Sequence, residues 1–169
     1  MSDLPPGYHD VPDEDRKKAQ AFFEKGKKVA DAGQWDFAIS MFLDGFKTDP
    51  ENTDAHAQLR EISLKRKASG GKGVGFMEAM KLKRAGSDDR ETFINAVKLL
   101  AHDPGDKGTM LAVAQAAQKG GFYDSAMWYA RQTFQANVSD PKKPDPKIFY
   151  ALKDIYRGIK GKHPENFAL

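Results

Sequence analysis

The sequence contains no cysteine among its 169 residues. A disulfide framework, a thiolate metal site and a cysteine nucleophile are therefore all excluded. The chain also lacks any apolar run near the roughly 18 residues that cross a bilayer. Its first residues lack the order of a secretion signal, in which a basic segment precedes an apolar one. We therefore expect a cytoplasmic protein that does not act in a membrane.

Histidine is scarce, and its four residues lie far apart along the chain, at positions 9, 56, 102 and 163. This separation provides no local spacing for metal ligands, so we expect surface or helix-cap roles, with His102 near a helix C-terminus. None of the serines lies in the strand-turn-helix context of a nucleophile elbow. We therefore expect no catalytic residue, no cofactor and no metal, and a protein that is not an enzyme.

The charge balance is mild, with a net charge of +3 and a pI near 8.9. This is far from the dense basic stripe of a nucleic-acid-binding protein, although it permits acidic partners. Hydrophobic residues make up 40% and charged residues 30% of the chain, which is typical of a globular protein with a large surface. We expect one elongated domain.

Apolar residues recur at helical spacing along most of the chain. In residues 19–32 they fall at Phe22, Phe23, Val29 and Ala30, while lysines occupy other faces. The same reading predicts helices over residues 13–32, 35–48, 53–67, 76–85, 88–102, 107–119, 122–137 and 145–160. No segment alternates with a period of two over a useful length, so we expect an all-α protein.

The same sequence pattern occurs three times. In each case a glycine precedes a predicted helix, and the helix ends at Asp-Pro. The glycine and proline are Gly33 and Pro50, Gly86 and Pro104, and Gly121 and Pro141, with separations of 17, 18 and 20 residues. Each glycine is predicted to adopt the left-handed conformation, and each proline prevents the helix from continuing. The pattern indicates an internal repeat of helical hairpins.

A glycine-rich loop over residues 67–75 interrupts this pattern. It is not a phosphate-binding loop, because Arg66 and Gly73 occupy positions where that motif requires glycine and Ser or Thr. The helix over residues 53–67 has no obvious partner before the loop. It either packs alone or pairs with the helix over residues 76–85.

Residues 19–52 resemble the tetratricopeptide repeat (TPR), a pair of antiparallel helices of about 34 residues. The features that match are Phe22, Gly26, Val29, Ala38, Phe42, Gly45 and Pro50. A looser unit covers residues 107–141, with its Asp-Pro three residues late, and a degenerate one covers residues 73–104. The resemblance implies a right-handed superhelix of antiparallel helix pairs, a TPR-like α-solenoid, over residues 13–169 after a flexible lead at residues 1–12.

The resemblance also implies a non-enzymatic adaptor or scaffold that binds a protein segment in a concave groove. The groove-facing candidates are Phe23, Lys27 and Ala30, then Met77, Lys81 and Arg84, then Leu111, Gln115 and Gln118. Their three basic side chains favour an acidic or C-terminal carboxylate ligand. The alternative interpretation is that these residues form ordinary solvated faces.

Three further segments of the sequence allow alternative interpretations. The basic residues between Lys65 and Arg84 could bind nucleic acid, although acidic residues lie between them. The final segment, residues 162–169 with the sequence KHPENFAL, resembles a helix start, so either a partner completes it or the chain is a module of a larger protein. Residues 5–8, PPGY, fit either a ligand of WW domains or a disordered lead.

Overall fold

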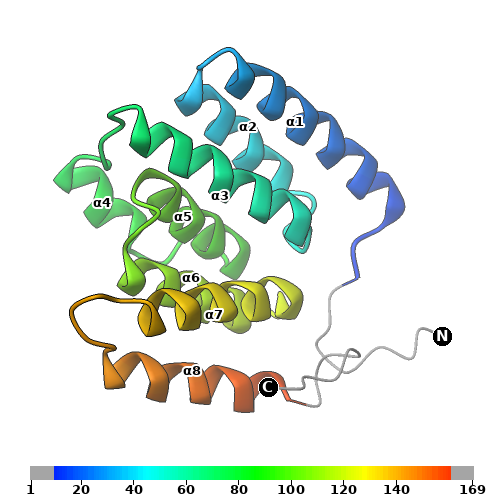
Figure 1. The fold of residues 1–169 in the computed structure, drawn as a ribbon. Coiled ribbons are helices and arrows are strands. Elements are labelled where there is room, and N and C mark those ends of the chain that lie inside the picture. The colour runs from blue at the N-terminus through cyan, green and yellow to red at the C-terminus, as the bar shows by residue number, and fades with distance from the viewer. Residues whose placement is uncertain (1–9, 161–169) are drawn as a thin grey trace.

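The computed structural model describes residues 10–160, and within that range it contains eight α-helices and no strand (Figure 1). The helices are α1 (Asp13–Asp31), α2 (Trp35–Phe46), α3 (Thr53–Ala68), α4 (Phe76–Leu82), α5 (Asp89–His102), α6 (Lys107–Lys119), α7 (Tyr123–Val138) and α8 (Pro146–Ile159). The all-α prediction is confirmed, and each predicted bound lies within three residues of the observed one. The PPGY segment, His9, His163 and the KHPENFAL segment lie outside the described residues.

The α1–α2 and α6–α7 hairpins are closed by the same turn. Gly33 and Gly121 both have φ of 77°, which only glycine adopts without strain. In each turn the glycine N–H donates to the carbonyl three residues back, and the next N–H donates to the carbonyl five residues back. This pair of hydrogen bonds is the Schellman motif, which satisfies carbonyls at the end of the helix. The two segments therefore repeat in backbone conformation as well as in sequence.

The prediction of a left-handed conformation for Gly86 is wrong. Gly86 does not have a positive φ, and its N–H donates to Thr92 Oγ1 at 2.8 Å. Asp88 then caps α5 by accepting a hydrogen bond from the N–H of Glu91 at 2.7 Å. Gly86 thus belongs to the N-terminal capping structure of α5, where side chains satisfy the backbone groups, and not to the end of α4.

Small residues and aromatic rings interlock between α1 and α2. A Cβ atom added to Gly45 would lie 2.3 Å from the ring of Phe23, and one added to Gly26 would lie 2.7 Å from the ring of Phe42. Each glycine therefore leaves the space that a ring from the facing helix fills. The centroids of Phe23 and Phe42 are 5.4 Å apart, and both rings are buried. Two glycines and two rings thus fix how closely the helices approach.

Helix α3 packs neither alone nor with α4. It contacts α2, α5 and α7, while α4 packs against α5. The glycine-rich loop and α4 are therefore an insertion between α3 and α5, two helices that pack against each other although the insertion separates them in sequence. Sequence proximity suggested the wrong partner because a flexible loop does not force consecutive helices together.

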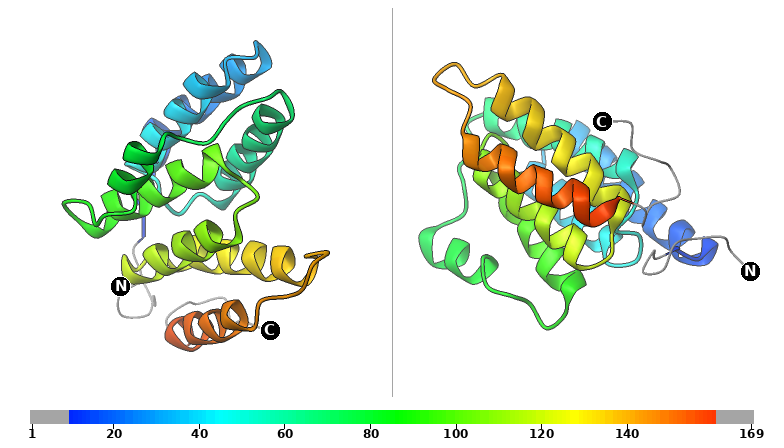
Figure 2. Two further views of the ribbon diagram at one scale, coloured as in Figure 1. Left: turned by 90° about the vertical axis from the view of Figure 1, so that its left-hand side faces the viewer. Right: turned by 90° about the horizontal axis from the view of Figure 1, so that it is seen from below.

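The helices follow one another in layers from α1 and α2 at one end of the molecule to α8 at the other (Figures 1 and 2). Helix α2 contacts both α3 and α5, α5 contacts α6, and α8 covers both α6 and α7. Each layer therefore buries its apolar side chains against the next one. None of the helices within residues 10–160 is long and apolar enough to cross a bilayer.

Glu51 ties two distant layers together through hydrogen bonds. Its carboxylate, in the turn between α2 and α3, accepts hydrogen bonds from the N–H groups of Asp124 and Ser125 at 3.1 and 3.2 Å. Ser125 Oγ in turn donates to the carbonyl of Pro50 at 2.7 Å. The first turn of α7 is therefore capped by a residue more than 70 positions earlier in the chain, which fixes how α7 sits on the preceding layer.

Candidate functional site

Helix α4 presents large apolar side chains to solvent. It spans seven residues, and Leu82 is its one buried side chain. Phe76 and Met77 at its first turn are 76% and 79% exposed, and Met80 one turn later is 45% exposed. A helix this short is unstable in isolation, so its contact with α5 must hold it in place. Phe76 and Met77 in particular leave most of their surface in solvent.

A groove with a volume of about 850 Å³ runs between α4 and α5. Its walls combine apolar, cationic and acidic side chains, namely Met77, Glu78, Met80, Lys81, Leu82, Arg84, Glu91, Asn95 and Lys98. Helix α4 supplies the apolar residues of this set, and α5 supplies only polar ones. An apolar strip bordered by charged groups is typical of a surface that binds a partner.

Both acidic side chains of the groove are engaged within the chain. Glu78 pairs with Lys98 at 2.7 Å, which joins α4 to α5 and lowers the pKa of the Glu78 carboxyl through this hydrogen bond. Glu91 accepts hydrogen bonds from the N–H and the hydroxyl of Ser87, and these bonds lower the pKa of Glu91. Lys81 and Arg84 therefore give the groove its positive character.

The structure brings three of the predicted site residues together. Met77, Lys81 and Arg84, expected to face a groove, line the one between α4 and α5. Lys27 lies elsewhere, beside Trp35 and Lys65 in a shallower groove of about 310 Å³ between the first hairpin and α3. The predicted residues of the first and the degenerate units therefore line two different surfaces.

The prediction for Phe23 is wrong. Phe23 is only 2% exposed because its ring fills the space over Gly45, so it cannot contact a partner. The family register places Phe23 on the groove face of α1, but the close approach of α2 covers it, and its ring stabilises the hairpin. Ala30 is largely buried but lines the same groove as Lys27.

The three site residues predicted on α6 lie in different environments, because α8 packs against part of that helix. Leu111 is half-buried against the core, and the Gln118 amide lies directly beside Gly158 of α8. Gln115 is exposed between them on the same helix. Helix α8 therefore takes up part of the α6 face that the resemblance assigned to a ligand.

The sequence reasoning missed the α5 side of the groove. Asn95 and Lys98 line it from α5, and neither was a candidate. The degenerate repeat predicted an antiparallel pair of helices over residues 76–85 and 88–102, so the facing residues of the second helix could have been found from helical spacing. Phe76 and Met80 lie on the same exposed surface and were also missed, because an apolar residue in an amphipathic pattern is normally assigned to the core.

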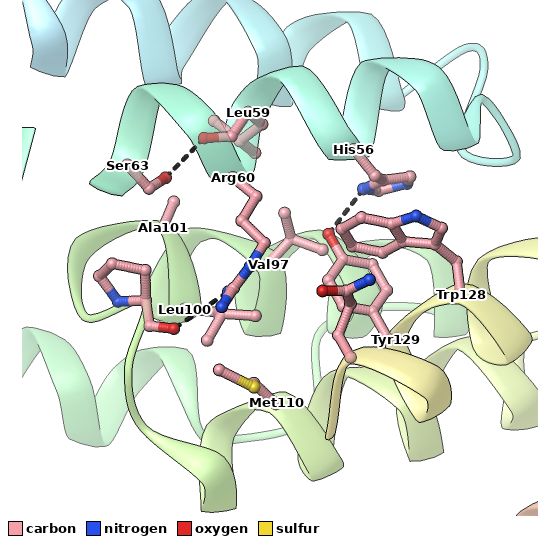
Figure 3. A pocket seen from close by; sticks show the side chains of 12 residues that line it. His56, Leu59, Arg60, Ser63, Val97, Leu100, Ala101, Met110, Trp128 and Tyr129 are labelled. Carbon is pink, nitrogen blue, oxygen red and sulfur yellow. Dashed lines mark hydrogen bonds between the residues drawn. The ribbon is translucent and has the colours of Figure 1, made fainter. Parts of the chain in front are cut away.

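A second cavity lies between α3, α5 and α7 and is shown in Figure 3. Its volume is about 20 Å³, which is room for roughly one water molecule. His56, Arg60 and Tyr129 are among its polar lining residues, and each of these three has a partner within the chain. Arg60 donates to the carbonyl of Pro104 at 3.1 Å, and Tyr129 is bonded to His56. The cavity is therefore a packing gap and not a ligand site.

His56 is buried completely, which corrects the expectation of a surface or cap role. Its Nε2–H donates to the carbonyl of Pro50 at 2.9 Å, and its Nδ1 accepts from the Tyr129 hydroxyl at 2.7 Å. Burial lowers the pKa of His56 to about 4, so the ring is neutral at pH 7. With both nitrogens occupied, His56 cross-links the layers instead of exchanging protons with a substrate. His102, by contrast, is half-buried at the end of α5, where its Nδ1 donates to the carbonyl of Lys98 at 2.9 Å.

The basic run at the end of α3 is neutralised within the chain. Lys65 pairs with Glu61 at 2.8 Å, and Lys67 pairs with Asp103 at 3.0 Å. The third residue, Arg66, is buried and donates to Asp36 at 2.7 Å. Because these cations already contact carboxylates, they provide a weak surface for phosphate groups.

Residues 10–160 contain no cluster of His, Asp and Glu side chains that could hold a metal ion. Trp35, Tyr123, Trp128 and Tyr129 all pack within or against the core. Comparisons of the chain with models of protein families, with curated proteins and with solved structures found no match.

Proposed function

We propose that this protein is a non-enzymatic adaptor of the TPR-like type, a right-handed superhelix of antiparallel helix pairs that binds a segment of another protein. The support comes from the chain itself. The α1–α2 and α6–α7 hairpins share one turn conformation, and α1–α2 has the interlocked small and aromatic residues of the TPR pattern. Successive layers pack in chain order, as in a solenoid.

The partner binds in the α4–α5 groove. The observation that carries this assignment is the exposure of Phe76, Met77 and Met80 on one short helix, beside the cations Lys81 and Arg84. Burying one such apolar side chain contributes about 1.5–3 kcal/mol, so two or three of them provide the apolar centre of a binding site. Within residues 10–160, the structure leaves these side chains exposed to water.

The charge of the groove favours an acidic segment. Lys98 neutralises Glu78, whereas Glu91 is hydrogen-bonded to the neutral Ser87 and keeps its negative charge. The groove therefore has three cationic side chains, Lys81, Arg84 and Lys98, against two carboxylates. Lys81 and Arg84 can then pair with carboxylates that flank the apolar residues of the partner. An acidic peptide with two apolar side chains, or one with a C-terminal carboxylate, meets these requirements.

Affinity capture from a native extract, followed by binding measurements with the purified partner fragment, tests the proposal. We expect Lys81→Glu combined with Arg84→Glu to weaken binding by at least about tenfold, and Met77→Ser to weaken it by a similar factor. Lys17→Glu combined with Lys28→Glu is the matched control, because both lysines are exposed on α1 and their replacement changes the net charge equally.

Unchanged binding by the α4 variants would remove the assignment of the groove. Titration of a labelled oligonucleotide at two salt concentrations separates this proposal from nucleic-acid binding. Phosphate-driven binding through the basic residues between Lys65 and Arg84 would fall steeply with salt. That result would replace the adaptor function with a nucleic-acid-associated one.

A further inference from the structure

Helix α8 has two apolar faces, and only one of them is covered. The first face carries Ile148, Leu152, Ile155 and Ile159, all buried in the core against the preceding layer. The second face is formed by Phe149 and Tyr156, which lie seven residues apart and are both half-buried. A helix with apolar residues on two faces is typical of an element with a neighbour on each side.

Helix α7 extends this second face into a groove. Its Phe134 is 41% exposed and lies 5.7 Å from Phe149 of α8, measured between ring centroids. One turn further on, Val138 is 50% exposed. The groove between α7 and α8 has a volume of about 470 Å³, with Phe134, Phe149 and Tyr156 as its aromatic lining.

The charged residues that line this groove are all cationic. They are Lys153, Arg157 and Lys160, which follow one another at intervals of three or four residues along α8. No acidic side chain is among the residues that line it. This distinguishes it from the α4–α5 groove, where Glu78 and Glu91 are present. An aromatic strip bordered only by cations is complementary to an apolar strip bordered by carboxylates.

The arrangement of the layers indicates what shape fits the groove. Helix α3 packs on α2, and α5 then contacts both α2 and α3. Helix α8 packs on α7 in the same order along the stack. A helix seated between α7 and α8 would make the pair of contacts that α5 makes with α2 and α3 in the earlier layer, although α8 also contacts α6.

We propose that the α7–α8 groove binds an amphipathic α-helix of a partner protein, with apolar side chains on one face and Asp or Glu along both edges of that face. The apolar side chains pack between Phe134, Phe149 and Tyr156, and the carboxylates pair with Lys153 and Arg157. Helix-in-groove binding of this kind uses side chains at positions i, i+3, i+4 and i+7. The proposal concerns a surface separate from the α4–α5 groove and does not depend on the function proposed for it.

A synthetic peptide of about 18 residues tests this proposal, since that length gives about five helical turns. It carries Leu and Phe at helical spacing on one face and Glu on both flanks. Two control peptides have Lys in place of every Glu, or the same residues in scrambled order. Titration into the full-length protein labelled with nitrogen-15 reports both affinity and location, and we expect shifts in residues 134–138 and 149–160.

Two variants of the protein sharpen the result. Lys153→Glu combined with Arg157→Glu should weaken the acidic peptide by at least about tenfold and improve binding of the lysine peptide. Phe134→Ser should weaken the acidic peptide by a comparable factor without a change in charge. Lys81→Glu combined with Arg84→Glu should leave its affinity unchanged, because those residues lie in the other groove.

Several outcomes would overturn the proposal. They are no binding of the acidic peptide, equal binding of the scrambled peptide, or shifts confined to residues outside α7 and α8. Light scattering adds a further one. A dimer that Phe134→Ser converts to a monomer would show that a second copy of this chain, and not an acidic helix of a partner, occupies the groove.

Discussion

The α1–α2 hairpin and α4 are both rich in phenylalanine and methionine, yet they use these residues in opposite ways. In the hairpin, Phe23 and Phe42 are buried against glycines of the facing helix. In α4, Phe76 and Met77 lie in solvent, and the helix is fixed by Leu82 and by the ion pair between Glu78 and Lys98.

The difference shows that composition does not determine which apolar side chains are buried. The hairpin has small residues at the spacing that lets two backbones approach, so each ring has a space to fill. Helix α4 has only seven residues and faces α5, whose side chains in the groove are polar. Phe23 and Phe42 of the hairpin stabilise the fold, whereas Phe76 and Met77 of α4 are exposed to solvent.

The largest expected effect comes from removing a ring of the interlocked hairpin. Phe42→Ala should lower the free energy of unfolding by about 3–5 kcal/mol, because it leaves a cavity opposite Gly26 that neither helix can close. Urea unfolding followed by circular dichroism measures this change. A loss below about 1.5 kcal/mol would show that the hairpin repacks and that the interlocking does not determine its stability.

The next largest effect concerns pH and the buried His56. The folded-state pKa of His56 is about 4, below its ordinary value of 6.5, so the unfolded chain binds a proton that the folded chain excludes between these values. Stability from this group is complete above pH 6.5 and is lost as the pH falls to 4. The expected loss is about 3 kcal/mol, from roughly 1.4 kcal/mol for each pKa unit.

Glu51 gives the stability of the protein the opposite dependence on pH. Its contribution must therefore be removed by substitution before that of His56 is measured. Burial and the nearby charge of Asp124 raise the pKa of Glu51 from 4.5 to about 7. The folded protein therefore loses the stability that protonated Glu51 provides as the pH rises through that range. In the Glu51→Gln variant, the free energy of unfolding should therefore fall as the pH falls, as expected for His56. When His56→Gln is added, the free energy of unfolding should depend less on pH. Parallel curves for these two variants would contradict a neutral, buried His56.

The smallest expected effect on stability is that of shortening an exposed side chain of α4. Met77→Ala should change the free energy of unfolding by less than about 0.5 kcal/mol, since the side chain is exposed and alanine favours a helix. The same denaturation experiment measures it beside Phe42→Ala. A loss above about 1 kcal/mol would mean that Met77 packs within the chain in solution, which would also remove it as a contact for a partner.

Local features of the fold were predicted well from the sequence. The eight helices lie where apolar spacing, glycines and prolines place them, because these signals act over one or two turns of chain. Gly26, Phe42 and Gly45, which match the TPR pattern, lie at the contact between α1 and α2. Met77, Lys81 and Arg84 were predicted to share a groove, and the structure places all three in one.

Predictions that depended on which helices of the chain pack together were wrong. The register of the resemblance turned Phe23 toward a ligand, whereas the ring is covered by α2 at Gly45. His56 was expected at the surface because a single histidine carries no signal of burial, but it contacts Pro50 and Tyr129 in the core. The partner of α3 could not be identified because the insertion that contains α4 separates α3 from α5 by about twenty residues of chain.

The sequence by itself determined where the helices begin and end, to within three residues, and the left-handed glycines of two hairpins, Gly33 and Gly121, since backbone conformation depends on near neighbours. Only the tertiary structure decided which apolar surfaces stay open. The α7–α8 groove and the exposed face of α4 have the same residue types as the core. They differ from it only in that no other described part of the chain packs over them, and contacts between distant segments are set by packing and not by local sequence.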